Sequence, residues 1–170
     1  MAGSAPRHTG AQQRSGFGRD YSRDPFGGYA EGIDQGRTPF PTSADAFADT
    51  RLSASTRIIG FDVAGQPTTV PVLVNEPTVV SIEADPPLVV FLDGLGGGSV
   101  FESLVDGSPT EFQVVDREII DSTSGSLWNA AGVATGGPKM GTELTMYPSR
   151  SSFWFAWVDI NHPTTVDLVR

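Results

Sequence analysis

Residues 57–92 read RIIGFDVAGQPTTVPVLVNEPTVVSIEADPPLVVFL, and this stretch decides the fold class. Short runs rich in Val, Ile, Thr and Phe, which are typical of strands, alternate with clusters of Gly, Pro, Asn and Asp, which are typical of turns. We therefore predict four short strands, at residues 57–63, 69–74, 78–82 and 88–92.

The same alternation continues to residue 147. We predict further strands at residues 100–105, 111–115, 118–120, 126–129 and 143–147. Between the first two, Asp106-Gly107-Ser108-Pro109 is a hairpin signal. Because strands recur at regular spacing and no long helical pattern separates them, the sequence predicts a mainly β fold. The expected architecture is a small antiparallel barrel or sandwich with short helical segments, preceded by an extended N-terminal arm.

One segment near the C-terminus favours a helix. Ser151 and Ser152 are good N-cap residues before the apolar stretch 153–160, and the stretch 161–163, Asn-His-Pro, is a plausible stop. A strand is the alternative, because the aromatic residues of this stretch suit one equally well.

Composition limits the functions that the chain can perform. The chain has 170 residues, no cysteine and a formal net charge of -9. The missing thiols exclude disulfides, thiolate metal sites and a cysteine nucleophile. The negative charge argues against nucleic acid as a partner. No apolar run approaches the roughly 20 residues that span a bilayer, and residues 1–8 lack the hydrophobic centre of a signal peptide, so the compartment is left open.

The composition changes near residue 50, which divides the chain into an arm, residues 1–50, and a β-rich domain, residues 51–170. The arm is rich in Gly, Ser, Arg and scattered aromatics, and such a stretch buries too little apolar surface to order itself. We expect its aromatic rings to bind pockets of a partner, with arginines stacking or pairing between them. The partner-binding residues predicted in this way are Arg14, Phe17, Arg19, Tyr21, Arg23, Phe26 and Tyr29. An inert tail is the alternative.

Three segments resemble domain-of-unknown-function family 3179. Residues 121–129, DSTSGSLWN, are similar to its "D-x-x-T-G-S-x-W" stretch, and residues 132–141 are similar to "G-x-A-x-x-G-P-x-x-G". Residues 152–157 followed by 162–165 resemble its "FWFAW…HP-x-T" close. The resemblance implies a mostly β domain in prokaryotic, often exported, proteins, and it implies no reaction. Many members carry a C-P-x-C-G-like segment where residues 89–98 of this chain have no sulfur.

Two polar groups of residues are candidates for chemistry. The glycine run 94–98 lacks both the dinucleotide and the P-loop pattern, so a hairpin loop is the better interpretation. Asp116, Arg117, Glu118 and Asp121 could coordinate a hard cation or act as an acid–base pair, but an arginine that pairs with its neighbouring carboxylates and pins a turn is the preferred interpretation.

A catalytic triad is conceivable but poorly supported. Ser124 or Ser126 could act with His162 and Asp159, yet no G-x-S-x-G elbow is present, and His162 is expected to cap or pack beside a proline. The densest aromatic set is expected to be core rather than a ligand groove. Its members are Trp128, Phe153, Trp154, Phe155 and Trp157.

These observations together favour a non-enzymatic accessory or structural subunit without a cofactor. It would dock through its arm onto protein partners in a larger complex, or onto neighbouring copies of itself. The alternative is a small-molecule or ion-binding domain of an exported protein. An enzyme acting through residues 116–121 and His162 ranks third.

Overall fold

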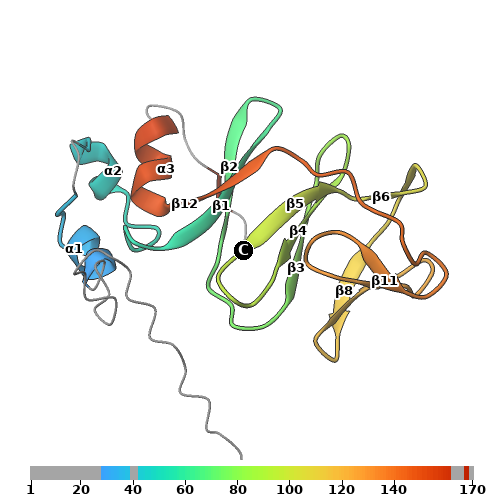
Figure 1. Ribbon diagram of the computed structural model, residues 1–170. Helices are drawn as coiled ribbons and strands as arrows, with labels where there is room; N and C mark the ends of the chain where they lie inside the picture. Colours follow the sequence, from blue (N-terminus) through green and yellow to red (C-terminus); the bar gives the residue numbers. More distant parts are fainter. Residues whose placement is uncertain (1–27, 39–41, 162–166, 169–170) are drawn as a thin grey trace, which may run out of the picture.

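The computed structural model describes residues 28–38, 42–161 and 167–168 (Figure 1). The helices of this part are α1 (Tyr29–Asp34), α2 (Ala44–Ala48) and α3 (Trp154–Asn161). The strands are β1 (Arg57–Val63), β2 (Gln66–Pro71), β3 (Thr78–Ile82), β4 (Leu88–Leu92), β5 (Gly98–Glu102), β6 (Leu104–Val105), β7 (Ser108–Pro109), β8 (Phe112–Val115), β9 (Glu118–Asp121), β10 (Leu127–Trp128), β11 (Ala134–Gly136), β12 (Ser149–Phe153) and β13 (Asp167–Leu168).

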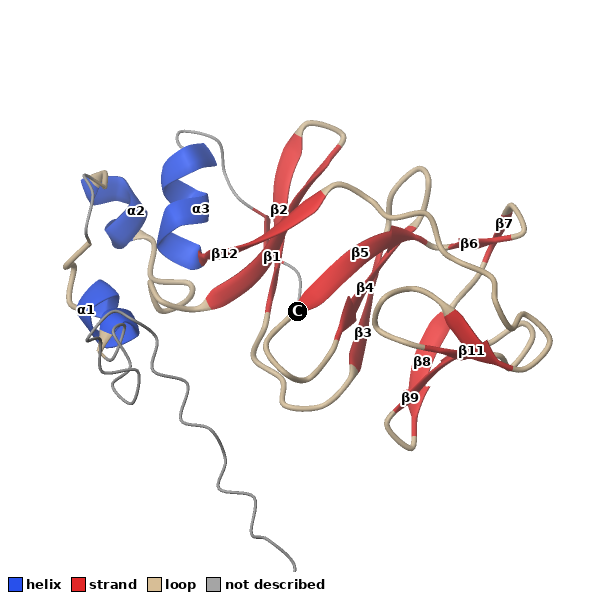
Figure 2. Cartoon of the chain, in the orientation of Figure 1, coloured by secondary structure: helices blue, strands red, loops and turns tan. Residues whose placement is uncertain are grey.

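The strands form several small sheets (Figure 2). Their orders are β12-β1-β2-β13, β3-β4-β5, β11-β10-β9-β8 and the two-stranded β6-β7. All pairs are antiparallel except β13 with β2, which is parallel. The mainly β, antiparallel fold with short helices that the sequence predicts is therefore confirmed.

The sheet β3-β4-β5 is the middle layer of the molecule. All five residues of β4 are buried, and they alternate between two cores. Val89 and Phe91 belong to a core shared with β8–β11, whereas the other three belong to a core shared with β1 and β2. This alternation is the period of two that a strand imposes on its side chains. It explains why β4 carries an unbroken apolar run.

The helices cover the opposite end of the molecule from β8–β11 (Figure 1). Ala46 of α2 and Trp154, Trp157 and Val158 of α3 form a third core with Ile58 of β1. Gly60 of β1 permits this packing, because a Cβ there would lie 2.7 Å from the Trp157 ring.

A ladder of aromatic rings fastens α1 and α2 to this end. The ring of Tyr29 lies 6.0 Å from that of Phe153, which lies 6.3 Å from Phe155. Phe155 in turn stacks on Phe47 of α2 at 5.7 Å, with the ring planes 6° apart. The described part of the predicted arm therefore contains two short helices, α1 and α2, which pack against the β-rich part. Residues 1–27 lie outside the described ranges, and the division of the chain at residue 50 stays a prediction.

Three hairpins use two-residue turns with a left-handed backbone, at residues 64–65, 106–107 and 116–117. The central residues have φ values of 52° and 85° at Ala64 and Gly65, and of 51° and 76° at Asp106 and Gly107. Turns of this kind match the twist of the flanking strands. The turn at Asp106 is as predicted, but it returns into β7 rather than into residues 111–115, which pair with β9.

The strands predicted at 57–63, 78–82 and 88–92 coincide with β1, β3 and β4. The helix predicted at 153–160 is confirmed as α3, which begins at Trp154; Ser151 and Ser152, predicted as its N-cap residues, instead lie in β12. The strand predicted at 143–147 is wrong, because this segment contributes only isolated bridges, Val133 with Glu143 and Phe101 with Met146. Within the described ranges, no helix has both the length and the apolar character needed to cross a bilayer.

Candidate functional site

The surface feature best suited to binding lies where two sheets end. β3 is an edge strand of the sheet β3-β4-β5, and β8 is an edge strand of the sheet β11-β10-β9-β8. A groove of about 500 Å³ opens between the start of β3 and β8. Its lining consists of Glu76, Pro77, Thr78, Val79, Phe112, Gln113, Val114 and Arg117.

The hydrogen-bond register fixes which main-chain groups of β8 point outward. The β8–β9 hairpin closes through Val115 and Glu118, so this pair exchanges hydrogen bonds, and the pattern alternates along the strands. The N–H of Asp121 donates to Ser126 on the other side of β9, as this register requires. The main-chain N–H and C=O of Phe112 and Val114 therefore point away from β9, toward the open edge.

The same reasoning applies to β3. The C=O of Val100 and the N–H of Glu102 bond to residues 147 and 145, away from β4. Hydrogen bonding alternates along each strand, so Val90 of β4, opposite Val100, bonds to its other partner, Val80 of β3. The main-chain groups of the residues on either side, Val79 and Ser81, therefore point away from β4, toward the open edge. Val79, which lines the groove, therefore presents main-chain groups as well as an apolar side chain. The groove thus combines two open strand edges with a lining of four apolar and four polar side chains, a combination that can receive an extended peptide.

A smaller cavity of about 180 Å³ adjoins the groove, with which it shares Pro77 and Arg117. Asp93 and Glu118 bring carboxylates to its wall, together with the amide of Asn129. Its volume is below the roughly 300 Å³ of typical ligand pockets, so only an ion or a very small molecule would fit. Among the described residues, no cluster of three or more His, Cys, Asp or Glu side chains could hold a metal ion.

Asp93 begins the glycine loop predicted to be a hairpin connection, and the loop does join β4 to β5. Its Oδ1 accepts hydrogen bonds from the N–H groups of Leu95, at 2.7 Å, and Gly97, at 2.9 Å. These main-chain donors hold the pKa of Asp93 below its usual value. Gly94 packs so closely that a Cβ would lie 2.6 Å from the backbone of Glu76. The carboxylate therefore organises the loop.

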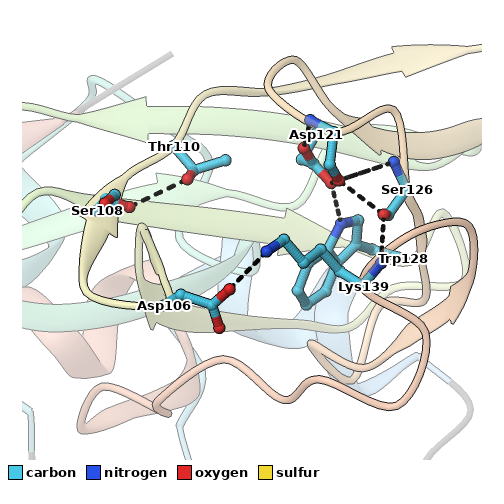
Figure 3. A network of polar contacts seen from close by, with 8 residues as sticks. Asp106, Ser108, Thr110, Asp121, Ser126, Trp128 and Lys139 are labelled. Atoms are coloured by element: carbon cyan, nitrogen blue, oxygen red, sulfur yellow. Dashed lines mark hydrogen bonds and ion pairs between the residues drawn. The ribbon is translucent and has the colours of Figure 1, made fainter.

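Asp121 is the buried centre of a polar network (Figure 3). Its carboxylate accepts hydrogen bonds from the N–H and Oγ–H of Ser124, from the N–H of Ser126 and from Nε1 of Trp128. Ser126 Oγ accepts a hydrogen bond from the N–H of Lys139. Each of these groups is used in holding the β9–β10 connection together. Asp121, Ser124, Ser126 and Trp128, which belong to the segment of family resemblance, therefore help to hold this connection in place.

The acidic cluster predicted near residue 117 does not converge. Asp116 and Arg117 form the turn between β8 and β9, with φ values of 51° and 68°, and both are exposed, as is Glu118. Asp121 lies apart from them in the buried network. Arg117 forms no ion pair with the described residues, contrary to the preferred interpretation of the sequence. Arg117 lines both the groove and the small cavity.

The conceivable triad is not assembled by the described residues. Ser124 and Ser126 lie in the β9–β10 connection, whereas Asp159 lies on α3 at the other end of the molecule (Figure 1). There Asp159 Oδ1 accepts a hydrogen bond of 2.9 Å from the N–H of Ser43, the N-cap of α2. His162 lies outside the described residues.

The aromatic set is core, as predicted, for four of its members. Trp128, Trp154, Phe155 and Trp157 are buried, and Phe153 is half-buried in the aromatic ladder. The ring of Trp157 lies between Gly60 and the guanidinium of Arg150, whose Cζ is 4.6 Å from the ring centroid.

Of the predicted partner-binding residues, only Tyr29 lies in the described ranges, where its ring contacts Phe153 of the same chain. Arg14, Phe17, Arg19, Tyr21, Arg23 and Phe26 lie outside those ranges. The groove itself was missed by the sequence analysis. The feature of the sequence that could have indicated the groove is the pair Val114-Val115. It interrupts the apolar–polar alternation of β8 with two exposed apolar residues.

A comparison with known families gives one match. The model of the family described as "Protein of unknown function (DUF3179)" matches residues 4–165, nearly the whole chain. No curated protein and no solved structure matches the chain.

Proposed function

We propose a docking function for this chain, which belongs to the family "Protein of unknown function (DUF3179)". The chain is a non-enzymatic accessory or structural subunit that docks through its N-terminal arm. The arm would bind protein partners in a larger complex, or neighbouring copies of the chain. The β-rich part is the body that the arm connects to its neighbours.

The observation that carries this proposal is a separation of charge along the sequence. Residues 1–27 contain four arginines and two aspartates, whereas residues 28–170 contain seven basic and eighteen acidic residues. A basic, aromatic segment on an acidic body is attracted to any surface that resembles that body. Arginine also stacks on aromatic faces and pairs with carboxylates, which makes it effective at protein interfaces.

Residues 29–34 of the arm are also firmly held. Ile33 of α1 is fully buried, and both carboxylate oxygens of Asp34 accept hydrogen bonds from Ser55. Together with the Tyr29–Phe153 contact, these interactions hold the segment that directly follows residues 1–27. A held neighbouring segment lowers the entropy that docking through residues 1–27 would cost.

The proposal is tested by the native mass of the full chain, purified and in cell extract. The variant replaces Phe17, Tyr21 and Phe26 by serine, and the matched control replaces Ser15 and Ser22 by alanine. We expect the full chain and the control to migrate in an assembly, and the aromatic variant to migrate as a monomer. An unchanged assembly in the aromatic variant would contradict the proposal. A deletion should stop at residue 27, because removing residues 28–50 would expose the core around Trp154.

A small-ion binding function is the second candidate, and the cavity lined by Asp93, Arg117 and Glu118 favours it. Calorimetric titration with calcium and with phosphate tests it directly. Binding that Glu118→Gln weakens for calcium, or Arg117→Gln for phosphate, would support this candidate; no heat of binding with either ion would exclude both.

A further inference from the structure

We propose that the groove between β3 and β8 receives residues 17–23 of a second copy of this chain, added as an extended strand along the open edge of β8. This inference rests on the proposed function and names its partner and receiving surface.

The first argument is the edge itself. The main-chain groups of Phe112 and Val114 point outward, and among the described residues no strand is hydrogen-bonded to β8 on that side; the neighbouring strand across the groove is β3. An open edge with apolar side chains is a template for another strand. Val114 is 36% exposed, and it lines the groove together with Pro77 and Val79.

The second argument is the pattern of the arm sequence. Phe17, Arg19, Tyr21 and Arg23 stand at alternate positions, so in an extended strand they share one face. The opposite face carries only small or acidic residues over residues 16–22. A strand of this kind places two aromatic rings, about 13 Å apart, against the apolar side chains of the groove. The arginine between them faces the groove as well, where Glu76 is part of the lining.

The third argument is charge. Glu76 lines the groove, and the β8–β9 hairpin with its flanks adds Glu111, Asp116 and Glu118 against the one basic residue Arg117. In and next to the segments that line the groove, acidic residues outnumber the one basic residue, so this surface complements a strand that carries arginine side chains.

The short linker between residues 23 and 28 favours a second copy of the chain, rather than the same chain, as the source of the bound segment. If Arg23 were bound in the groove of its own chain, five Cα–Cα steps would separate it from Gly28, a span of at most about 18 Å. Tyr29 packs on Phe153, which belongs to the sheet β12-β1-β2-β13. Two spacings between packed sheets, together roughly 20 Å, separate this sheet from the sheet that contains β8. Figure 1 shows α1 and β8 at opposite ends of the molecule. The linker is too short for the chain to occupy its own groove.

The test is sedimentation velocity of the purified full chain over a range of concentrations. Val114→Arg places a cation in the groove, and Val115→Arg is the matched control, because Val115 is an exposed neighbour that does not line the groove. We expect self-association of the full chain that weakens at least about tenfold in Val114→Arg and remains nearly unchanged in Val115→Arg. Raising the ionic strength from about 0.1 M to 1 M should weaken it as well.

Two results would overturn the inference: a full chain that stays monomeric at every concentration, or a Val114→Arg variant that associates like its parent. Neither result decides the proposed function. If the serine variant of Phe17, Tyr21 and Phe26 still abolishes an assembly while Val114→Arg does not, the arm docks elsewhere. If the serine variant also has no effect, docking through the arm fails.

Discussion

The indole Nε1 of Trp128 donates a hydrogen bond of 3.0 Å to Oδ2 of Asp121, and both side chains are buried. This contact joins β9 to β10 on the inside of the sheet that carries β8. The turn between the two strands depends on the same carboxylate, which also accepts hydrogen bonds from Ser124 and Ser126. The open edge of β8 is therefore supported by a polar centre on the adjacent strand β9, where Asp121 is the register partner of Phe112.

Asp121→Asn should lower the free energy of unfolding by about 1–3 kcal/mol, because an amide nitrogen cannot accept the hydrogen bonds that the carboxylate receives. Urea unfolding followed by tryptophan fluorescence measures this. The control is Asp106→Asn, which removes an exposed ion pair with Lys139 and should cost less than about 1 kcal/mol. Equal effects of the two substitutions would show that the network is not structural.

Stability should fall in acid because of the same residue. Burial raises the pKa of Asp121, but hydrogen bonds from Ser124, Trp128 and Ser126 outweigh burial and hold the pKa below its usual value. A lowered pKa in the folded state stabilises the protein above the unfolded value of about 3.9, and this contribution is lost as the pH falls further. Urea midpoints measured from about pH 6 to pH 2 should fall more steeply for the parent than for Asp121→Asn. Parallel curves would contradict this assignment.

Gly60→Ala should destabilise the protein by about 1–3 kcal/mol, because its Cβ would overlap the Trp157 ring at 2.7 Å. Gly136→Ala is the matched control, since its nearest neighbour, Cδ1 of Leu127, is 3.4 Å away. Thermal unfolding measures both variants. A Gly60→Ala variant as stable as the control would show that the helical end tolerates rearrangement.

Phe47→Ala should release α2 without unfolding the sheets, because Phe47 stacks on Phe155 at the outer end of the aromatic ladder. We expect faster amide hydrogen exchange at residues 44–48 and unchanged exchange in β4. Leu95→Ala, at a loop position that is 91% exposed, is the control and should leave both regions unchanged. Uniformly faster exchange throughout the chain would show that the helical end is inseparable from the sheets.

The sequence predicts β1, β3 and β4 because these strands combine β-branched residues with flanking turn residues, which are local signals. It fails for β12, whose residues 149–153, SRSSF, have little strand preference and are held by pairing with β1. It also fails for α1 and α2, whose short sequences become helical through burial of Ile33 and Ala46 against distant residues. The missing element in each case is tertiary contact, which overrides local preference.

The groove was not predictable for the same reason. Its two walls, Pro77–Val79 and Phe112–Val114, are separated by more than thirty residues and meet only because two sheets share the core around Phe91. Asp121, by contrast, was identified as a candidate for chemistry, and only its burial shows that its carboxylate is used in structure.

Disulfide trapping tests the central claim most directly, because the chain contains no cysteine of its own. One full chain carries Tyr21→Cys and a second carries Val114→Cys; the control replaces the second by Met140→Cys, an exposed position outside the groove. The two chains are mixed under mild oxidation, and the mixed dimer is identified by mass spectrometry. We predict that the Tyr21 and Val114 positions form a disulfide between chains in high yield, well above the control pair. A yield no greater than that of the control would contradict docking of the arm into the groove of a second copy.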